Sequence, residues 1–162
     1  MSRKSAGGER AARVPVRLDI SRILEIIPHR YPIILVDRVT DVVAGESICG
    51  HKMITLGEFW CPRNVTRTPV MPGILIIEAL TQLASILAYV SEPFDPARSQ
   101  LYLLGFDKVK LRHRAIPGDK LDLVVGVSQH RSNTWKFTAE ATVENTLCAQ
   151  ADLLGSVVDR DD

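Results

Sequence analysis

The chain has 162 residues, enough for one domain with its own core, and its net charge of +1 argues against a dedicated nucleic-acid-binding protein. Hydrophobic residues make up 46% of it and charged residues 24%, as in ordinary globular proteins. The cysteines Cys49, Cys61 and Cys148 lack the spacing of a disulfide framework, which predicts reduced thiols and a cytoplasmic location.

The ends of the chain are predicted to lie outside the folded domain. Residues 1–17 are small, polar and basic, without the apolar centre of a signal peptide, and predict a disordered tail. A single domain is expected over residues 18–158, followed by an acidic tail at 159–162.

The first predicted elements are one short helix and two strands. The helix begins at Asp19, a favoured N-cap residue, and ends at Pro28. Residues 33–55, IILVDRVTDVVAGESICGHKMIT, predict two strands joined by the turn AGES. A loop follows from Leu56 to about Pro69.

Pro72 and Gly73 open a long helix that is predicted to reach about Tyr89, since proline is favoured in a first helical turn. Residues 74–90, ILIIEALTQLASILAYV, are apolar on nearly every side, which indicates a helix buried all round. Glu78 and other polar residues interrupt this run, so no membrane span is predicted.

The remaining sequence predicts four strands after a Pro-rich loop at residues 91–100: LYLLGFDKVKLRH, DKLDLVVGVSQHR, NTWKFTAEATVEN and LCAQADLLGSVV, with a hairpin at IPGD. Two strands, one buried helix and four further strands fit an α+β hotdog fold, in which one antiparallel sheet wraps around the helix. Such a sheet leaves an edge strand exposed, so pairing into dimers is expected.

Glu78 is the only charged residue of the predicted long helix. Burial of a lone carboxylate predicts a raised pKa, which suits a general acid or base. The free N–H groups of Gly73 and Ile74, at the positive end of the helix dipole, are suited to polarising a carbonyl oxygen. This combination suggests chemistry on an acyl group. The residues alone leave an equal alternative, in which Glu78 reaches the surface or pairs with an arginine of a neighbouring strand.

Four blocks of sequence carry a resemblance to a known family: IPHRYPIILVDRV, TPVMPGILIIEALTQLA, GFDKVKLRHRAIPGDKL and WKFTAEATVE. In order and spacing they resemble the beta-hydroxyacyl-acyl carrier protein dehydratases of the FabZ/FabA type, from about Leu18 to Val157. The resemblance implies a hotdog fold, a dimer as the building unit and often a trimer of dimers. It also implies removal of water from a (3R)-hydroxyacyl chain on acyl carrier protein, which gives the trans-2-enoyl form. No metal and no cofactor beyond the pantetheine of the substrate are expected.

The resemblance also implies site residues. The family's dyad is a histidine in a Gly-His-Phe-Pro loop and a glutamate on the helix, contributed by opposite subunits. The glutamate corresponds to Glu78 and the helix-end amide to Gly73, and the residues expected along the substrate are Met71, Pro72, Ile74 and Gln82. The histidine position, however, is occupied by Asn64. An amide cannot take a proton at pH 7, and loss of a positioned base typically costs about 10² to 10⁴ in rate.

No other side chain is predicted to replace this histidine. His29, His51, His113 and His130 are each expected to be structural or exposed, and Cys61 lacks the basic partner that a nucleophilic cysteine needs.

Lys108, Lys110, Arg112 and Arg114 alternate with other residues, which predicts four cations on one face of a strand. This row is either a solvated face or, as the family favours, a docking surface for the acidic acyl carrier protein and its phosphopantetheine arm.

Three hypotheses for the function follow from the sequence. The first is a dehydratase with an altered or incomplete dyad, in fatty acid or related acyl-chain biosynthesis. The second is a half-site or non-catalytic subunit that pairs with a complete dehydratase. The third is an acyl thioesterase that uses Glu78, Gly73 and Asn64.

Overall fold

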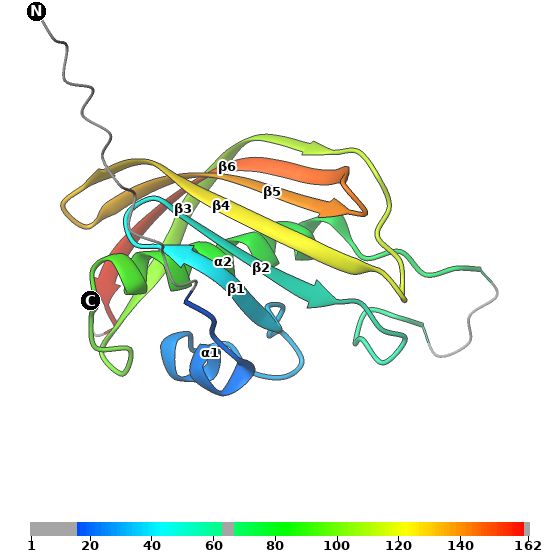
Figure 1. The fold of residues 1–162 in the computed structure, drawn as a ribbon, viewed down its shortest axis with the longest axis horizontal. Helices are drawn as coiled ribbons and strands as arrows, with labels where there is room; N and C mark the ends of the chain where they lie inside the picture. Colours follow the sequence, from blue (N-terminus) through cyan, green and yellow to red (C-terminus); the bar gives the residue numbers. More distant parts are fainter. Residues whose placement is uncertain (1–15, 63–66, 161–162) are drawn as a thin grey trace, which may run out of the picture.

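The computed structural model describes residues 16–62 and 67–160, which form one antiparallel sheet and two helices (Figure 1). The six strands lie in the order β1-β2-β4-β5-β6-β3. The elements are α1 (Ile20–Ile26), β1 (Arg38–Val43), β2 (Ser47–Met53), α2 (Gly73–Ser91), β3 (Ser99–Leu111), β4 (Lys120–Arg131), β5 (Thr134–Val143) and β6 (Thr146–Asp159).

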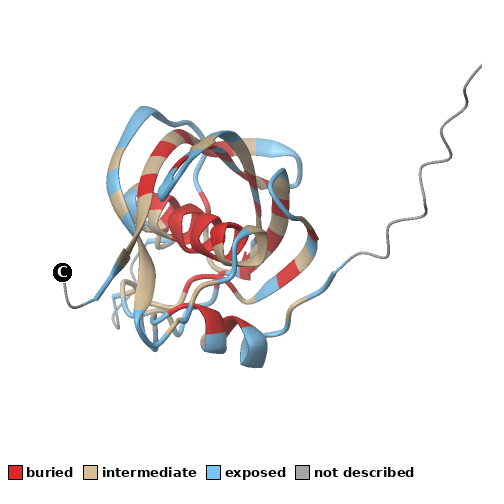
Figure 2. Ribbon diagram, turned by 90° about the vertical axis from the view of Figure 1, so that its left-hand side faces the viewer, coloured by how far each residue is buried: buried red, intermediate tan, exposed pale blue. Residues whose placement is uncertain are grey.

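The long helix α2 forms the centre of the fold, and the curved sheet encloses it (Figure 2). Its side chains from Ile76 to Ala88 are almost all buried, whereas its first turn is partly exposed. By length and composition α2 is apolar enough to cross a membrane, but 67% of its most apolar window is buried inside the fold. It is therefore the core helix of a hotdog fold, as the sequence predicted.

The strands alternate buried and exposed side chains, so that one face of the sheet packs on α2. In β5, Trp135, Phe137, Ala139 and Ala141 point inward, and the residues between them are exposed. The small alanines lie in the second half of β5, which leaves room for the helix to approach the sheet closely.

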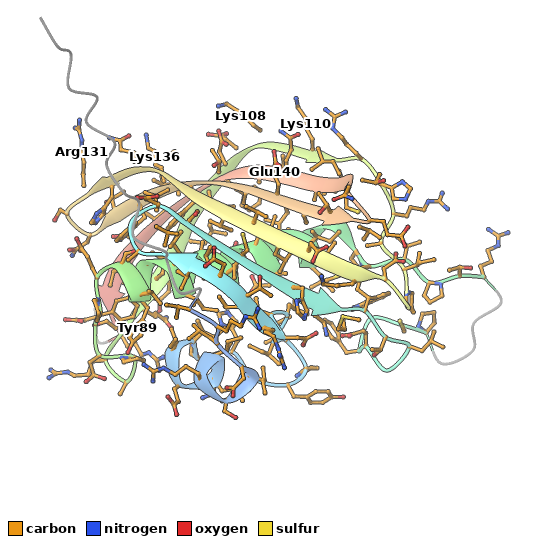
Figure 3. All side chains as sticks on the ribbon, viewed as in Figure 1. Tyr89, Lys108, Lys110, Arg131, Lys136 and Glu140 are labelled. Carbon is orange, nitrogen blue, oxygen red and sulfur yellow. The ribbon has the colours of Figure 1, made fainter. Side chains whose placement is uncertain are left out.

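Strand β3 differs from its prediction. It ends at Leu111, and its pairing with β6 shifts between Asp107 and Lys110, where Lys108 has a φ of 50°. Arg112 and Arg114 therefore lie beyond the strand, and the prediction of four cations on one strand face is wrong. Lys108 and Lys110 do project from the same side of the sheet (Figure 3), and Nζ of Lys108 lies 2.8 Å from Oδ2 of Asp152.

Strand β3 is also a free edge of the sheet and carries exposed apolar side chains. Tyr102, Leu104 and Phe106 are each 45–60% exposed along this edge. The opposite edge, β1, is shorter and bridges to Leu18 at Val39. An unpaired apolar edge favours association with another strand.

Candidate active site

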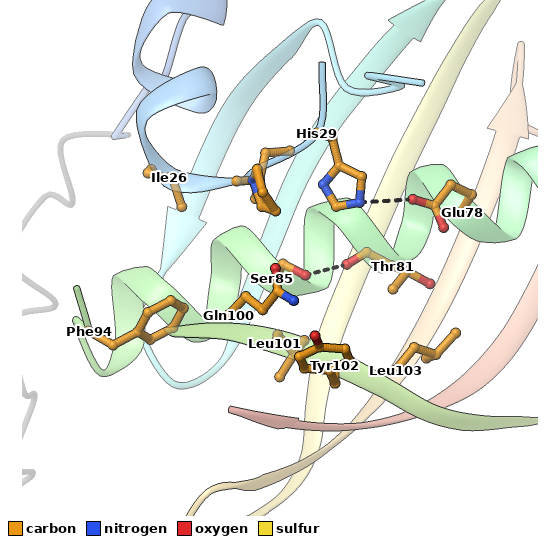
Figure 4. A pocket seen from close by; sticks show the side chains of 12 residues that line it. Ile26, His29, Glu78, Thr81, Ser85, Phe94, Gln100, Leu101, Tyr102 and Leu103 are labelled. Carbon is orange, nitrogen blue, oxygen red and sulfur yellow. Dashed lines mark hydrogen bonds and ion pairs between the residues drawn. The ribbon is translucent and has the colours of Figure 1, made fainter. Parts of the chain in front are cut away.

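Glu78 lies at a cavity of about 220 Å³ between α2, the segment that follows α1, and the first half of β3 (Figure 4). The cavity extends along α2 from Glu78 and His29 past Thr81 and Ser85 toward Phe94. The hydroxyls of Thr81 and Ser85 donate to carbonyls one turn earlier in the helix, so their polar atoms are already paired. The walls are otherwise mostly apolar, which suits an acyl chain.

The carboxylate of Glu78 is held at one oxygen by two donors. Nε2 of His29 lies 3.1 Å from Oε1 of Glu78, and Nε2 of Gln82 donates to the same oxygen at 2.9 Å. Burial raises the pKa of Glu78, but the hydrogen bonds from His29 and Gln82 favour the ionised form and lower this pKa below its ordinary value. The predicted raised pKa is therefore wrong, because the carboxylate is not alone.

Arg30 fixes the turn that carries His29. Its guanidinium donates to the carbonyls of Leu24, Ile27 and His29 at 2.7–2.9 Å, so it binds one carbonyl of the last turn of α1 and two in the segment that follows. The short helix thus ends at a defined position beside α2. His29 follows directly from that end.

Gln82 of α2 forms hydrogen bonds to residues 33–35, which follow His29 in the chain. Its Oε1 accepts the N–H of Leu35 at 2.8 Å, and its Nε2 donates to the carbonyl of Ile33 at 2.8 Å as well as to Glu78. One buried amide therefore aligns both the carboxylate and the chain that presents His29.

The N-terminus of α2 lies one turn before Glu78. The N–H groups of Gly73 and Ile74 donate no hydrogen bond within the described residues, so they are available to a carbonyl oxygen. A Cβ placed on Gly73 would lie 2.3 Å from Cδ1 of Leu111, so glycine permits β3 to approach the helix end. A second hollow of about 340 Å³, lined in part by Ile74, Glu78 and Phe106, opens on this side.

The predicted site residues are only partly brought together. Glu78, Gly73 and Ile74 lie at one end of α2, and Pro72 is its N-cap. Met71 is almost fully buried and Gln82 is 0% exposed. Their contact with a substrate stays a prediction. Asn64 lies outside the described residues.

The histidines were predicted to be structural or exposed, and three of them are. His51 belongs to β2, His113 is exposed after β3, and His130 stacks on Trp135 at 3.6 Å between ring centroids. His29 is the exception, since it lines the cavity and contacts Glu78. The only feature of the sequence that could have indicated a role for His29 in the site was its place in the block IPHRYP.

Neither a metal site nor an activated thiol is evident in the part of the chain that the structure describes. Residues 16–62 and 67–160 contain no group of three His, Cys, Asp or Glu side chains that could hold a metal ion. Burial and the Glu58 carboxylate raise the pKa of Cys61, which disfavours a nucleophilic thiolate.

Comparisons with known proteins identify relatives over nearly the whole chain. A family model described as the FabA-like domain matches residues 27–152. A 3-hydroxyacyl-[acyl-carrier-protein] dehydratase FabZ from Sorangium cellulosum is 50% identical over 149 residues, which cover 92% of this chain and 96% of the relative. A protein of the same name from Myxococcus xanthus is 42% identical over 144 residues, 89% of this chain and 94% of the relative.

Two solved structures share the fold at low identity. The dehydratase heterocomplex ApeI:P from Xenorhabdus doucetiae superposes with a TM-score of 0.69 at 17% identity, covering 92% of this chain and 94% of the other. A hot-dog-like protein from Thermanaerovibrio acidaminovorans gives 0.58 at 19% identity, covering 73% and 84%.

Proposed function

This chain belongs to the FabA-like family, as a relative of the FabZ 3-hydroxyacyl-acyl carrier protein dehydratases, and we propose that it removes water from (3R)-3-hydroxyacyl thioesters to give trans-2-enoyl thioesters. The observation that carries the proposal is Glu78, an acid–base group at an apolar cavity, in a chain 50% identical to a named FabZ dehydratase. This reaction belongs to fatty acid or related acyl-chain biosynthesis, and we expect it in the cytoplasm.

The proposed substrate is carried on the phosphopantetheine arm of acyl carrier protein, as the names of the relatives suggest. The cavity beside Glu78 would take the acyl chain, and the N–H groups of Gly73 and Ile74 would polarise its thioester carbonyl. Lys108, Lys110, Arg112 and Arg114 are all exposed and would attract the acidic carrier. Elimination of water changes no net oxidation state, so no redox cofactor is expected.

A dimer is proposed as the working unit, alone or as a trimer of dimers. The exposed apolar edge of β3 and the hollow beside Ile74 and Glu78 are continuous through Phe106, and a second chain paired at this edge would cover both.

Asn64 supports a second candidate function. In the family the loop histidine and the helix glutamate come from opposite subunits, so a chain with Asn64 and Glu78 would complete one of the two sites in a dimer with a complete dehydratase. A thioesterase remains the third candidate, because an ionised Glu78 beside helix-end amides would also suit activation of water at a thioester.

One assay separates these candidates. The purified chain is incubated with 3-hydroxybutyryl- and crotonyl-acyl carrier protein, and the products are identified by mass spectrometry. Enoyl and hydroxyacyl interconversion that is lost in Glu78→Gln supports the dehydratase, at a rate on the order of 10² to 10⁴ below that of a complete family member. Free acid supports the thioesterase, and the absence of both products from the isolated chain contradicts the proposal of a self-sufficient enzyme.

A further inference from the structure

The two oxygens of the Glu78 carboxylate have different surroundings. Oε1 accepts from both His29 and Gln82, at 3.1 and 2.9 Å. Oε2 accepts no hydrogen bond within the described residues. In Figure 4 it points away from His29. An arriving proton would therefore bind Oε2, because a proton on Oε1 would face two donors.

The ring of His29 fits one tautomer at this position. Its Nδ1 is buried and has no hydrogen-bond partner among the described residues. A proton on Nδ1 would be a buried donor without an acceptor, which is costly. The proton therefore belongs on Nε2, where it points at Glu78.

From this geometry, and resting on the proposed dehydration, we infer that His29 is a positioning residue. Its Nε2–H and the Gln82 amide hold Glu78 as an ionised carboxylate. Only Oε2 of this carboxylate exchanges a proton with the substrate. Tyr102 of β3 is the other ionisable side chain that lines the cavity together with Glu78 and His29. His29 acts through Glu78 and does not need to contact the substrate.

An ionised Glu78 can carry both proton steps of the elimination. The C2–H bond breaks and its proton goes to Oε2, while the electron pair moves toward the thioester carbonyl oxygen as an enolate. The pair then returns to form the C2–C3 double bond as the C3–O bond breaks, and the same proton passes from Oε2 to the departing hydroxide, which leaves as water. Glu78 is again ionised, and no other reagent is consumed. This route requires the C2 proton and the C3 oxygen on one face of the substrate, and it needs no loop histidine.

The test measures Glu78 directly, without turnover. Protein labelled with ¹³C at the glutamate carboxyl carbons is titrated by NMR, and the Glu78 signal is assigned from its loss in Glu78→Gln. His29→Leu removes the donor and is expected to move the titration midpoint of Glu78 to higher pH. His29→Gln places an amide N–H near the former Nε2 and is expected to keep the wild-type midpoint.

The control is His51→Gln, because His51 is also half-buried with an unpartnered Nδ1 but lies in β2, away from the cavity. It is expected to leave the Glu78 midpoint unchanged. If His29→Leu does not fold, His29→Phe keeps a ring and still lacks the donor. An unchanged midpoint in the folded non-donating variant would overturn the inference.

Kinetics provide the second readout. The acidic limb of kcat is expected to move to higher pH in His29→Leu, with kcat reduced about tenfold, KM little changed, and recovery in His29→Gln. A purely structural role for His29 would leave the acidic limb in place and would contradict the inference. Absence of enoyl product from the wild type would instead reject the proposed function, while the NMR titration still decides the role of His29.

Discussion

At the scale of single residues, Glu78 couples the acid–base state of the site to the stability of the fold. Because its pKa is lower in the folded protein than its ordinary value of about 4.3, the unfolded chain binds more protons between these two values. The stabilisation is present above the ordinary value and is lost as the pH falls through the lowered one. We expect urea denaturation at pH 7 and pH 3.5 to show a smaller loss of unfolding free energy in Glu78→Gln than in the wild type. Glu140→Gln, which removes an exposed carboxylate on β5, is the control, and equal losses in Glu78→Gln and the wild type would contradict the prediction.

Gly73 allows a separate prediction, in which activity and stability change differently. An alanine Cβ would displace Cδ1 of Leu111, but that side chain is exposed and can turn away. The unfolding free energy of Gly73→Ala should therefore stay within about 1 kcal/mol of the wild type. The methyl group and the displaced leucine would still obstruct the helix-end amides, so kcat/KM should fall at least tenfold. Gly126→Ala, whose Cβ meets nothing closer than 3.4 Å, should keep kcat/KM, and an active Gly73→Ala would exclude a substrate at the helix end.

At the scale of elements, the attachment of residues 33–35 to α2 depends on Gln82. Gln82→Leu would leave the buried N–H of Leu35 and the carbonyl of Ile33 without their partner. Each unsatisfied buried group costs about 1–3 kcal/mol, so the variant should lose roughly 2–5 kcal/mol of unfolding free energy. Ser85→Ala also removes a buried polar group of α2, but its hydroxyl bonds only within the helix, so it should lose less than about 1 kcal/mol. Similar losses in the two variants, measured by urea denaturation, would mean that Gln82 does not hold this segment.

The same elements explain how much of the molecule could be predicted from sequence. The helix α2 was predictable because Pro72 and Gly73 mark its start and a pattern that is apolar on nearly every side follows. The strands were predictable from alternation and turns. The end of β3 could not be predicted, because the positive φ of Lys108 and the shifted pairing nearby do not change the alternation of residue types in the sequence. The contact of His29 with Glu78 could not be predicted, because the two residues are 49 positions apart in the sequence and meet only through the path of the segment after α1. The direction of the Glu78 pKa shift depends on that contact, so it could not be predicted either.

For the whole molecule, the dimer proposed at the exposed edge of β3 would decide which chains can share a site. A second copy and a complete dehydratase would pair with the same apolar side chains, since the relatives are 42–50% identical over nearly the whole chain. Pairing with a complete dehydratase would create one site with both family groups, Glu78 from this chain and a histidine from the partner. The other site would combine the partner's glutamate with Asn64 and lack the loop histidine.

We therefore predict that a mixed dimer turns over hydroxyacyl substrate faster than the self-paired chain, by on the order of 10² or more. Co-expression with a complete dehydratase from the same cell, with a different affinity tag on each chain, isolates the mixed species. Glu78→Gln should lower the turnover of the mixed dimer to about that of the self-paired chain, because it removes the glutamate from the site that has the partner's loop histidine. A Gln substitution of the partner's own glutamate is the matched control and should leave the mixed dimer active, because that glutamate would belong to the site without a loop histidine. Recovery of self-paired dimers alone, or full activity of the mixed dimer with Glu78→Gln, would show that this chain does not share its site in this way.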